Sequence, residues 1–276
     1  MYLQHFGLSE FPFRITPDTG FAFSAQSHQE ALNTLLVALQ CGEGFVKITG
    51  EVGTGKTLLC RRLLQTLGDG GAVTAYLPNP YLDPDTLLRA LAEELQLGDA
   101  DGLDQFHLLK RINLGLLDHA RQGRRVVLCI DEAQAMPLPT LEALRLVSNL
   151  ETEKRKLLQI VLFGQPELDE KLADPSVRQL LQRIGFHHRL SGLGRAEVAL
   201  YLQHRLRVAG YRGEPMFSDG AVRALRRASR GTPRLINILA HKSLLSAFGE
   251  GRQSVRRRHV RGAARDTEGA GSPGWW

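Results

Sequence analysis

The chain has 276 residues, of which 43% are hydrophobic and 23% are charged, and this composition predicts a globular protein with a full core. Its three cysteines are scattered, without CxxC or metal-ligand spacing, which excludes a disulfide framework and predicts a reduced compartment. The sequence has no run of about 18 apolar residues, and its start lacks the basic-then-apolar order of a secretory signal. We therefore expect a cytoplasmic protein without a transmembrane segment, whose membrane contacts are peripheral or made through a partner.

The formal net charge of +6 is concentrated near the end of the chain. Six arginines lie between Gly251 and Arg265 with no acidic residue among them, and without these six the remaining chain is formally neutral. Arginines clustered in this way contact nucleic acid or an anionic lipid surface, or they form a solvated helix face. All three interpretations stay open for the central arginines Arg256, Arg257 and Arg258.

The pattern of apolar residues predicts the helices and strands in chain order. The first 26 residues are rich in Phe and Pro and predict an extended segment packed by its aromatic side chains. Ser27 and Glu30 have the spacing of a capping box and predict a helix that ends near Gln40. Short apolar runs then predict strands, and amphipathic spacing predicts helices. We expect strand 45–49, helix 56–67, strand 72–77, helix 84–95, helix 104–122, strand 125–130, helix 138–150, strand 157–163 and strand 185–190.

After residue 190 the pattern changes, and only helices are predicted, at 195–209, 218–229, 234–248 and 256–265. Apolar strands that alternate with amphipathic helices specify an α/β fold with a parallel sheet. The sequence therefore predicts a parallel five-stranded sheet flanked by helices, followed by a small all-α lid domain. The expected regions are an N-terminal segment 1–26, an α/β domain 27–190, a lid 191–266 and a disordered tail 267–276.

A glycine-rich turn joins the first predicted strand to the helix that follows it. Gly50-Glu51-Val52-Gly53-Thr54-Gly55-Lys56-Thr57 matches G-x-x-x-x-G-K-[ST] at every fixed position. The glycines allow successive backbone N–H groups to point at a phosphate, and the helix N-terminus adds partial positive charge. Lys56 is predicted to reach the β- and γ-phosphates, and the Thr57 hydroxyl to bind Mg²⁺. The sequence thus predicts an ATP site over Gly50–Leu58, with Mg²⁺ as its metal.

An acidic pair follows the third predicted strand. The apolar run Val126–Ile130 leads directly to Asp131 and Glu132, at the edge of the sheet where ligands of open α/β sheets bind. Asp131 is predicted to hold Mg²⁺ and its waters, and Glu132 to orient and polarise the attacking water. A carboxylate that merely caps a strand is the alternative. Since a complete phosphate-loop motif lies upstream, the pair favours ATP hydrolysis over storage of the nucleotide.

These motifs together resemble AAA+ ATPases, and more narrowly the ExeA/GspA-like ATPases of bacterial secretion and pilus systems. The matching stretches are Met1–Leu8, Pro12-Phe13, Thr16–Asp18, His28–Leu32, Gly50–Thr57, Ile130–Gln134, Leu144–Thr152, Phe163–Leu168, Gly231–Asn237 and Arg258–Val260. The resemblance spans about residues 1–266 and implies a P-loop NTPase (AAA+) fold. Longer members continue into a membrane span and a periplasmic part. Because this chain stops after the helical lobe, we expect it to resemble most the members that serve the mannose-sensitive haemagglutinin (type IV) pilus.

The resemblance also implies roles for further residues. Gln165, after the fourth strand, matches the sensor-1 position beside the γ-phosphate, with a turn-capping glutamine as the alternative. Arg234, at the start of a lid helix, matches sensor 2, which reaches the phosphates. Arg183 is favoured over Arg178 as the arginine finger that reaches the ATP of a neighbour, and a surface arginine without a role is the alternative for each. A finger in trans implies a homo-oligomer, either a ring or a filament.

Three functions are compatible with these motifs. The first is an assembly ATPase that moves or positions parts of a pilus or type II secretion apparatus at the inner membrane, with assembly proteins as its partners. The second is a DNA-handling AAA+ regulator resembling the TniB/TnsC transposition ATPases, which the basic C-terminal region favours. The third is a slow nucleotide switch that gates a partner. The N-terminal signature and the order of the motifs favour the first.

Overall fold

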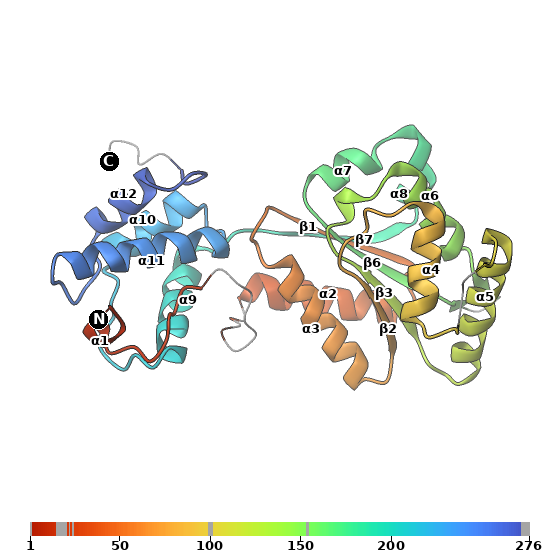
Figure 1. The fold of residues 1–276 in the computed structure, drawn as a ribbon, viewed down its shortest axis with the longest axis horizontal. Helices are drawn as coiled ribbons and strands as arrows, with labels where there is room; N and C mark the ends of the chain where they lie inside the picture. Colours follow the sequence, from red (N-terminus) through yellow and green to blue (C-terminus); the bar gives the residue numbers. More distant parts are fainter. Residues whose placement is uncertain are drawn as a thin grey trace. The chain divides into compact units, whose positions relative to one another are not determined.

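The protein is described from a computed structural model that covers residues 2–14, 21, 23, 25–98, 102–152 and 155–271. The chain forms two compact units, which we treat separately (Figure 1). The sheet unit comprises Glu30–Gly50 and Leu59–Leu190, and the helical unit comprises Met1–Gln29, Glu51–Leu58 and Ser191–Trp276. Within the covered residues, no helix combines the length and the hydrophobicity that crossing a membrane requires.

The sheet unit is built on five parallel strands in the order β2-β3-β6-β1-β7. Every residue of β1, β3 and β6 is buried, as expected for strands that helices cover on both faces. The predicted parallel five-stranded sheet is therefore confirmed, and each strand lies within two residues of its predicted range. The bounds are Phe45–Gly50 for β1, Val73–Leu77 for β2, Val126–Ile130 for β3, Gln159–Gly164 for β6 and Ile184–Leu190 for β7.

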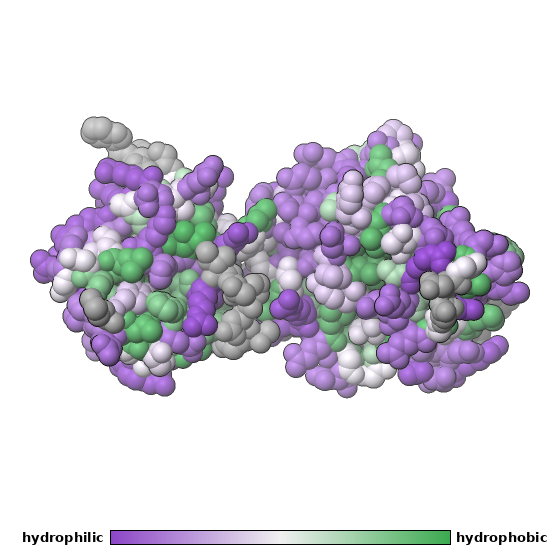
Figure 2. Space-filling model, viewed as in Figure 1, coloured by the Kyte–Doolittle hydropathy of each residue, from purple (hydrophilic) through white to green (hydrophobic). Residues whose placement is uncertain are grey.

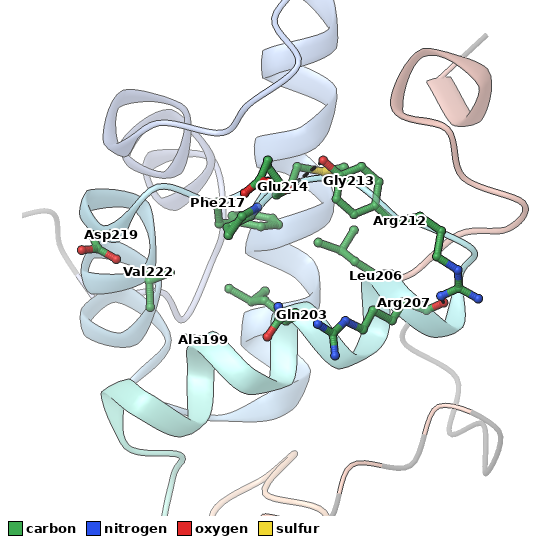
Figure 3. Close-up of a pocket in the computed structure, with 14 residues that line it drawn as sticks. Ala199, Gln203, Leu206, Arg207, Arg212, Gly213, Glu214, Phe217, Asp219 and Val222 are labelled. Carbon is green, nitrogen blue, oxygen red and sulfur yellow. Dashed lines mark hydrogen bonds between the residues drawn. The ribbon is translucent and has the colours of Figure 1, made fainter.

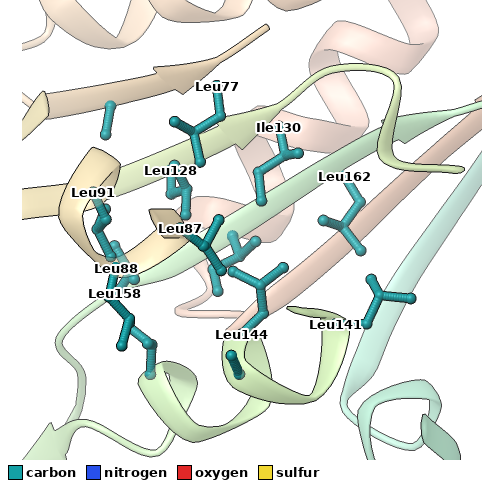
Figure 4. Close-up of a cluster of buried hydrophobic side chains, with 14 of the residues drawn as sticks. Leu77, Leu87, Leu88, Leu91, Leu128, Ile130, Leu141, Leu144, Leu158 and Leu162 are labelled. Carbon is teal, nitrogen blue, oxygen red and sulfur yellow. The ribbon is translucent and has the colours of Figure 1, made fainter. Parts of the chain in front are cut away.

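The two faces of this sheet carry two separate hydrophobic clusters, because successive strand residues point to opposite sides. Leu128 and Ile130 pack with the longer helices of one face, whose leucines are drawn in Figure 4. Val127 and Cys129 pack on the other face, against α2 and α3. The helices of the first face are α4 (Pro84–Glu94), α5 (Gln105–Arg121), α6 (Leu138–Ser148), α7 (Glu167–Leu172) and α8 (Arg178–Leu181), and those of the second are α2 (Gln26–Gln40) and α3 (Lys56–Asp69).

A capping residue accounts for where α4 begins, and the start of α2 corrects one prediction. Asp83 accepts hydrogen bonds from the backbone N–H groups of the first turn of α4, as the sequence predicts. The capping box predicted at Ser27 is wrong. Helix α2 begins at Gln26, with the His28 N–H donating to Ala25 O at 3.1 Å, so Ser27 lies within the first turn. Its hydroxyl is buried and has no hydrogen-bond partner among the described residues.

Several short elements are absent from the sequence-based prediction. They are the two-stranded antiparallel ribbon β4 (Glu151–Thr152) and β5 (Arg155–Lys156), the 3₁₀ turns η2 (Ala133–Ala135) and η3 (Pro175–Val177), and the helices α7 and α8. None exceeds six residues, so each is too short to show the periodicity by which longer helices and strands are recognised.

The helical unit contains α9 (Arg195–Val208), α10 (Asp219–Ser229), α11 (Pro233–Gly249) and α12 (Arg257–Arg265), which confirms the four helices predicted after residue 190. Helix α12 is followed by a segment whose Gly271 N–H donates to Ala228 O at 2.8 Å. Residues 272–276 of the predicted disordered tail lie outside the described residues.

The start of the chain belongs to the core of the helical unit. Residues Tyr2–Phe6 form helix α1, where the sequence predicts an extended segment. The reason is that Tyr2 and Phe6, one helical turn apart, both pack into the cluster formed by α9 to α12. The Arg205 Nε donates to Pro12 O at 2.5 Å and ties the following stretch to α9. Residues 15–20, 22 and 24 of the predicted N-terminal segment lie outside the described residues.

Two leucines of α6 allow the contribution of the sheet-unit core to be measured. Leu144 is fully buried, whereas Leu146 is 42% exposed on the same helix. We expect Leu144→Ala to lower the free energy of unfolding by about 2–5 kcal/mol, since it leaves a cavity, and Leu146→Ala to change it by less than about 1 kcal/mol. Urea denaturation of both variants measures the difference, and equal losses would contradict this assignment of the core.

Candidate active site

The phosphate-loop motif closes the turn between β1 and α3. Gly53 and Gly55 have φ angles of 78° and 98°, a region that residues with a Cβ rarely adopt, so the turn requires glycine at both positions. Lys56 and Thr54 are buried. The Lys56 Nζ donates to Glu51 O at 3.2 Å and the Thr54 hydroxyl to the same oxygen at 2.8 Å. The loop therefore has the tight shape and the buried ammonium group that a phosphate cradle needs.

His28 supports this loop. In the sequence it stands out only as part of the family stretch His28–Leu32. The His28 Nε2 lies 2.8 Å from Thr54 O, and because a carbonyl oxygen can only accept, Nε2 carries the proton. A Cβ on Gly55 would lie 2.7 Å from the same nitrogen. His28 thus fixes the peptide between Thr54 and Gly55, whose orientation determines where the next N–H points. The sequence gives little indication of this contact, because His28 lies in the predicted first turn of a helix.

Arg234 contacts the phosphate loop from α11, within the helical unit. The Arg234 backbone N–H donates to Gly53 O at 3.3 Å, and a Cβ on Gly53 would lie 2.5 Å from the Arg234 Cβ. Gly53 therefore serves both the backbone geometry and the close approach of this arginine. The structure brings Arg234 to the loop, and its role as a sensor of the phosphates remains a prediction.

The acidic pair lies immediately after β3 in the sheet unit. Asp131 is buried, and its backbone N–H donates to Leu77 O at 2.9 Å, which continues the pairing of β3 with β2. Glu132 follows with a φ of 50°, in the left-handed region that is costly for a residue with a side chain. Its N–H donates to Asp131 Oδ1 at 3.0 Å. This backbone geometry turns the chain sharply directly after the strand.

Two glutamine amides hold the Glu132 carboxylate. Gln165 Nε2 donates to Glu132 Oε2 at 3.1 Å, and Gln134 Nε2 donates to the same oxygen at 2.5 Å. The Gln165 backbone N–H also donates to Gln134 Oε1 at 2.9 Å, which links the ends of β3 and β6. The structure therefore places Gln165 beside the candidate base, while its sensor role remains a prediction. Gln134 belongs to the family stretch Ile130–Gln134, but its contact with Glu132 is not predicted, because a glutamine two residues after an acidic pair does not by itself indicate a role.

The two candidate fingers are not part of this arrangement. Arg183 directly precedes β7, whose Ile184 pairs with Phe45 and whose Leu190 pairs with Gly50. Because β7 runs from Ile184 to Leu190, the Arg183 backbone lies about 20 Å from the edge at which β1 ends. Its Nη1 donates to Ser148 Oγ at 3.2 Å. Arg178 is exposed at the start of α8. Arg183 therefore does not lie at the edge that carries Glu132 and Gln165.

The residues predicted to bind Mg²⁺ suit that ion. Asp131 and Thr57 offer a carboxylate and a hydroxyl, which are oxygen ligands of the kind that Mg²⁺ prefers. In the described part of the chain, no group of three or more His, Cys, Asp or Glu side chains could hold a metal by itself. A buried carboxylate with one hydroxyl fits an ion that takes its remaining ligands from phosphate oxygens and water.

A separate cavity of about 430 Å³ lies within the helical unit, between α9 and the segment that leads into α10 (Figure 3). Its floor is apolar, with Leu206 and Phe217, and Arg207 and Arg212 stand at its rim. As far as its lining is described, it contains none of the predicted site residues.

Comparisons with known proteins agree with this geometry. A family model described as an AAA domain matches residues 40–172. Over all 276 residues the chain is 42% identical to general secretion pathway protein A of Aeromonas hydrophila, and it covers 50% of that protein. It is 26% identical over 209 residues, or 76% of the chain, to the Holliday junction branch migration complex subunit RuvB of Parasynechococcus marenigrum, of which it covers 53%. The chain thus spans about half the length of the curated relatives that it matches.

Solved structures share the fold. Cdc6p from Pyrobaculum aerophilum matches 91% of this chain and 71% of its own, with a TM-score of 0.65 and 19% identity. The RuvB branch migration motor of Thermotoga maritima matches 93% and 73%, with a TM-score of 0.58 and 18% identity. The fold, the phosphate-loop motif and these sequence matches together support an AAA+ P-loop NTPase. Within that class the chain is ExeA/GspA-like, which confirms the resemblance predicted from its sequence.

The contact between His28 and the phosphate loop can be tested by nucleotide binding. We expect His28→Ala to raise the Kd for ATP about five- to thirtyfold, which corresponds to the loss of about 1–2 kcal/mol from one buried hydrogen bond. His28→Gln, whose amide can replace Nε2–H, is expected to restore most of the affinity. Titration with a fluorescent ATP analogue measures both variants. Should both lose affinity equally, or should only the melting temperature change, His28 would be a packing residue.

Proposed function

We propose that the chain binds Mg·ATP through Gly50–Leu58 and hydrolyses it at a subunit interface, to drive or position the assembly of a type II secretion apparatus or a type IV pilus. The observation that carries the hydrolytic part is Glu132, which directly follows the buried Asp131 and is held by two glutamine amides. A site that only stored nucleotide would need the phosphate loop but no fixed carboxylate beyond the metal ligand.

Each residue of the candidate site has a separate role in the proposed hydrolysis of ATP. Lys56 binds the β- and γ-phosphates, while Thr57 and Asp131 are the protein's ligands for Mg²⁺, which when bound neutralises phosphate charge. Glu132 accepts a hydrogen bond from the attacking water and orients it. Gln134 and Gln165 donate to one oxygen of Glu132 and so fix the rotation of its carboxylate. Arg234, whose backbone N–H donates to Gly53 O, carries its guanidinium to the phosphates in this proposal.

The arginine finger comes from a second subunit in this proposal. Arg183 lies at the opposite edge of the sheet from the end of β1, so it cannot serve the ATP bound by its own chain. It can serve a neighbour's ATP in a ring or filament, where it would stabilise the charge of the transition state. Arg178, exposed on α8, is the second candidate.

The biological process is inferred from the relatives. General secretion pathway protein A, which is 42% identical over the whole chain, supports a role in secretion. We propose assembly proteins at the inner membrane as the partners, and a cytoplasmic protein that contacts the membrane peripherally. Among ExeA/GspA-like proteins we propose MshM, of the mannose-sensitive haemagglutinin pilus, as the functional counterpart.

A slow nucleotide switch is the second candidate, and one observation favours it. The hydrogen bonds from Gln134 and Gln165 hold Glu132 to the ends of β3 and β6. If a partner must release these bonds before Glu132 reaches water, basal turnover is slow and ATP binding alone carries the signal.

ATP turnover as a function of protein concentration tests the shared site. We expect the rate to rise more steeply than linearly, since each site needs a neighbour. Glu132→Gln should lower it at least about a hundredfold, and Arg183→Ala about a thousandfold or more without weakening ATP binding. Arg121→Ala, which removes an exposed arginine from α5, is the matched control and should be silent. A linear rate together with a silent Arg183→Ala would contradict the finger and favour the switch.

Cells that carry Glu132→Gln or Lys56→Ala distinguish an assembly ATPase from a slow nucleotide switch. We expect Glu132→Gln and Lys56→Ala each to abolish secretion or surface pili, because an assembly ATPase must both bind and hydrolyse. A switch would instead tolerate Glu132→Gln and fail with Lys56→Ala. Immunoblots with equal amounts of each variant provide the control for expression.

A further inference from the structure

The positive charge of the protein is spread over the helical lobe and is not confined to its end. Residues 191–276 carry 16 basic and 6 acidic side chains, a net charge of +10, whereas residues 1–190 carry a net charge of −4. The assignment of the basicity to the six arginines after Gly251 is therefore incomplete. Four further arginines lie on α10 or directly after it, at positions 223, 226, 227 and 230.

Four arginines line one shallow depression of the helical unit. The depression measures about 360 Å³, and the residues described in its lining are Arg195, Arg223, Arg226 and Arg227. Three of them stand at the i, i+3 and i+4 positions of α10, opposite its buried face, so the helix itself gathers them on one side. Arg195 joins them from the first turn of α9. The arrangement follows from the pairing of two helices and is not visible as a run in the sequence.

Among the residues that the structure describes, no acidic side chain pairs with these four arginines. In the described part of the chain none of the four side chains forms an ion pair or a hydrogen bond. Other cations of the same lobe do have partners, since Lys242 pairs with Asp266 at 3.0 Å. Like charges this close repel one another, and a bound anion removes that repulsion. The planar guanidinium groups match phosphate oxygens in particular.

The basic surface continues onto the neighbouring helix. Helix α12 packs with α10, and Arg257 begins α12 beside Gly220, where a Cβ would lie 3.7 Å from the Arg257 Cβ. The buried side of α12 is formed by Val260 and Ala263, among others. Its exposed side carries Arg257, Arg265 and Arg258, of which Arg258 pairs with Glu250. Hydrophilic side chains lie in this region of the face shown in Figure 2.

We infer that this surface binds the phosphate backbone of duplex DNA. The lining described for the depression contains no aliphatic or aromatic side chain, so it lacks the apolar anchors by which a helix enters a lipid surface. It also lacks the aromatic platforms on which unstacked bases of a single strand would lie. A duplex carries its phosphates on the outside of the helix, and the concave shape suits a protruding backbone. Binding of this kind positions DNA without reading its sequence.

Fluorescence anisotropy with a short labelled duplex tests the inference on the full chain, with and without ATP. Four phosphate contacts predict a slope of about −3.6 in log affinity against log salt between about 50 and 200 mM. The double substitution Arg223→Gln, Arg227→Gln should reduce that slope by about 1.8 and weaken binding roughly sixtyfold at 0.1 M salt. Because the assay does not depend on ATP hydrolysis, its failure leaves the proposed ATPase function untouched.

A matched control removes the same charge elsewhere in the same unit. Arg207→Gln with Arg212→Gln, at the rim of the other cavity, should leave the slope nearly unchanged. Equal losses in the two double variants would show nonspecific attraction to a basic lobe and overturn the inference. So would tighter binding to a single strand of the same length. Binding to vesicles that contain phosphatidylglycerol, with none to the duplex, would assign the surface to the membrane instead.

Discussion

The parallel pairing of β1 between β6 and β7 positions every element of the candidate site in the sheet unit. This register aligns Thr49 with Gly164 on one side and Gly50 with Leu190 on the other. The phosphate loop and Gln165 therefore start from neighbouring strands at one edge of the sheet, and β3, next to β6, brings Asp131 to the same edge. Residues more than 100 positions apart in sequence become neighbours because backbone hydrogen bonds in a buried sheet fix where each strand ends.

Strain at this edge is supported by the buried sheet beneath it. The left-handed backbone at Glu132 costs about 1–3 kcal/mol, which surrounding structure must offset. Three buried strands and hydrogen bonds from Gln134 and Gln165 hold the residue there. Close packing also requires glycine at position 164, because a Cβ there would lie 2.6 Å from the Leu168 side chain. The geometry of Glu132, the carboxylate proposed to activate water, is thus maintained by packing that has no chemical role.

The phosphate loop also receives contacts from two regions distant in sequence. His28 bonds to Thr54 O, and the Arg234 N–H bonds to Gly53 O. The N-terminal residues pack among α9 to α12 and so belong to the same core as the helix that carries Arg234. A change in the conformation of the loop on binding or losing a phosphate would be transmitted to both regions. This mechanical link is what an AAA+ protein needs to convert nucleotide state into movement.

The five strands, the long helices, the phosphate loop and the acidic pair were all predictable from the sequence alone. Each is encoded in a short window, either as apolar residues at a fixed period or as glycines and polar residues at fixed spacing. Other features became visible only in the folded chain. Strand β1 lies between β6 and β7, and Gln134 and Gln165 hold Glu132. His28 supports the phosphate loop, and α9 and α10 bring four arginines together. These features depend on which distant segments pair, and a local pattern fixes burial and direction but not the partner.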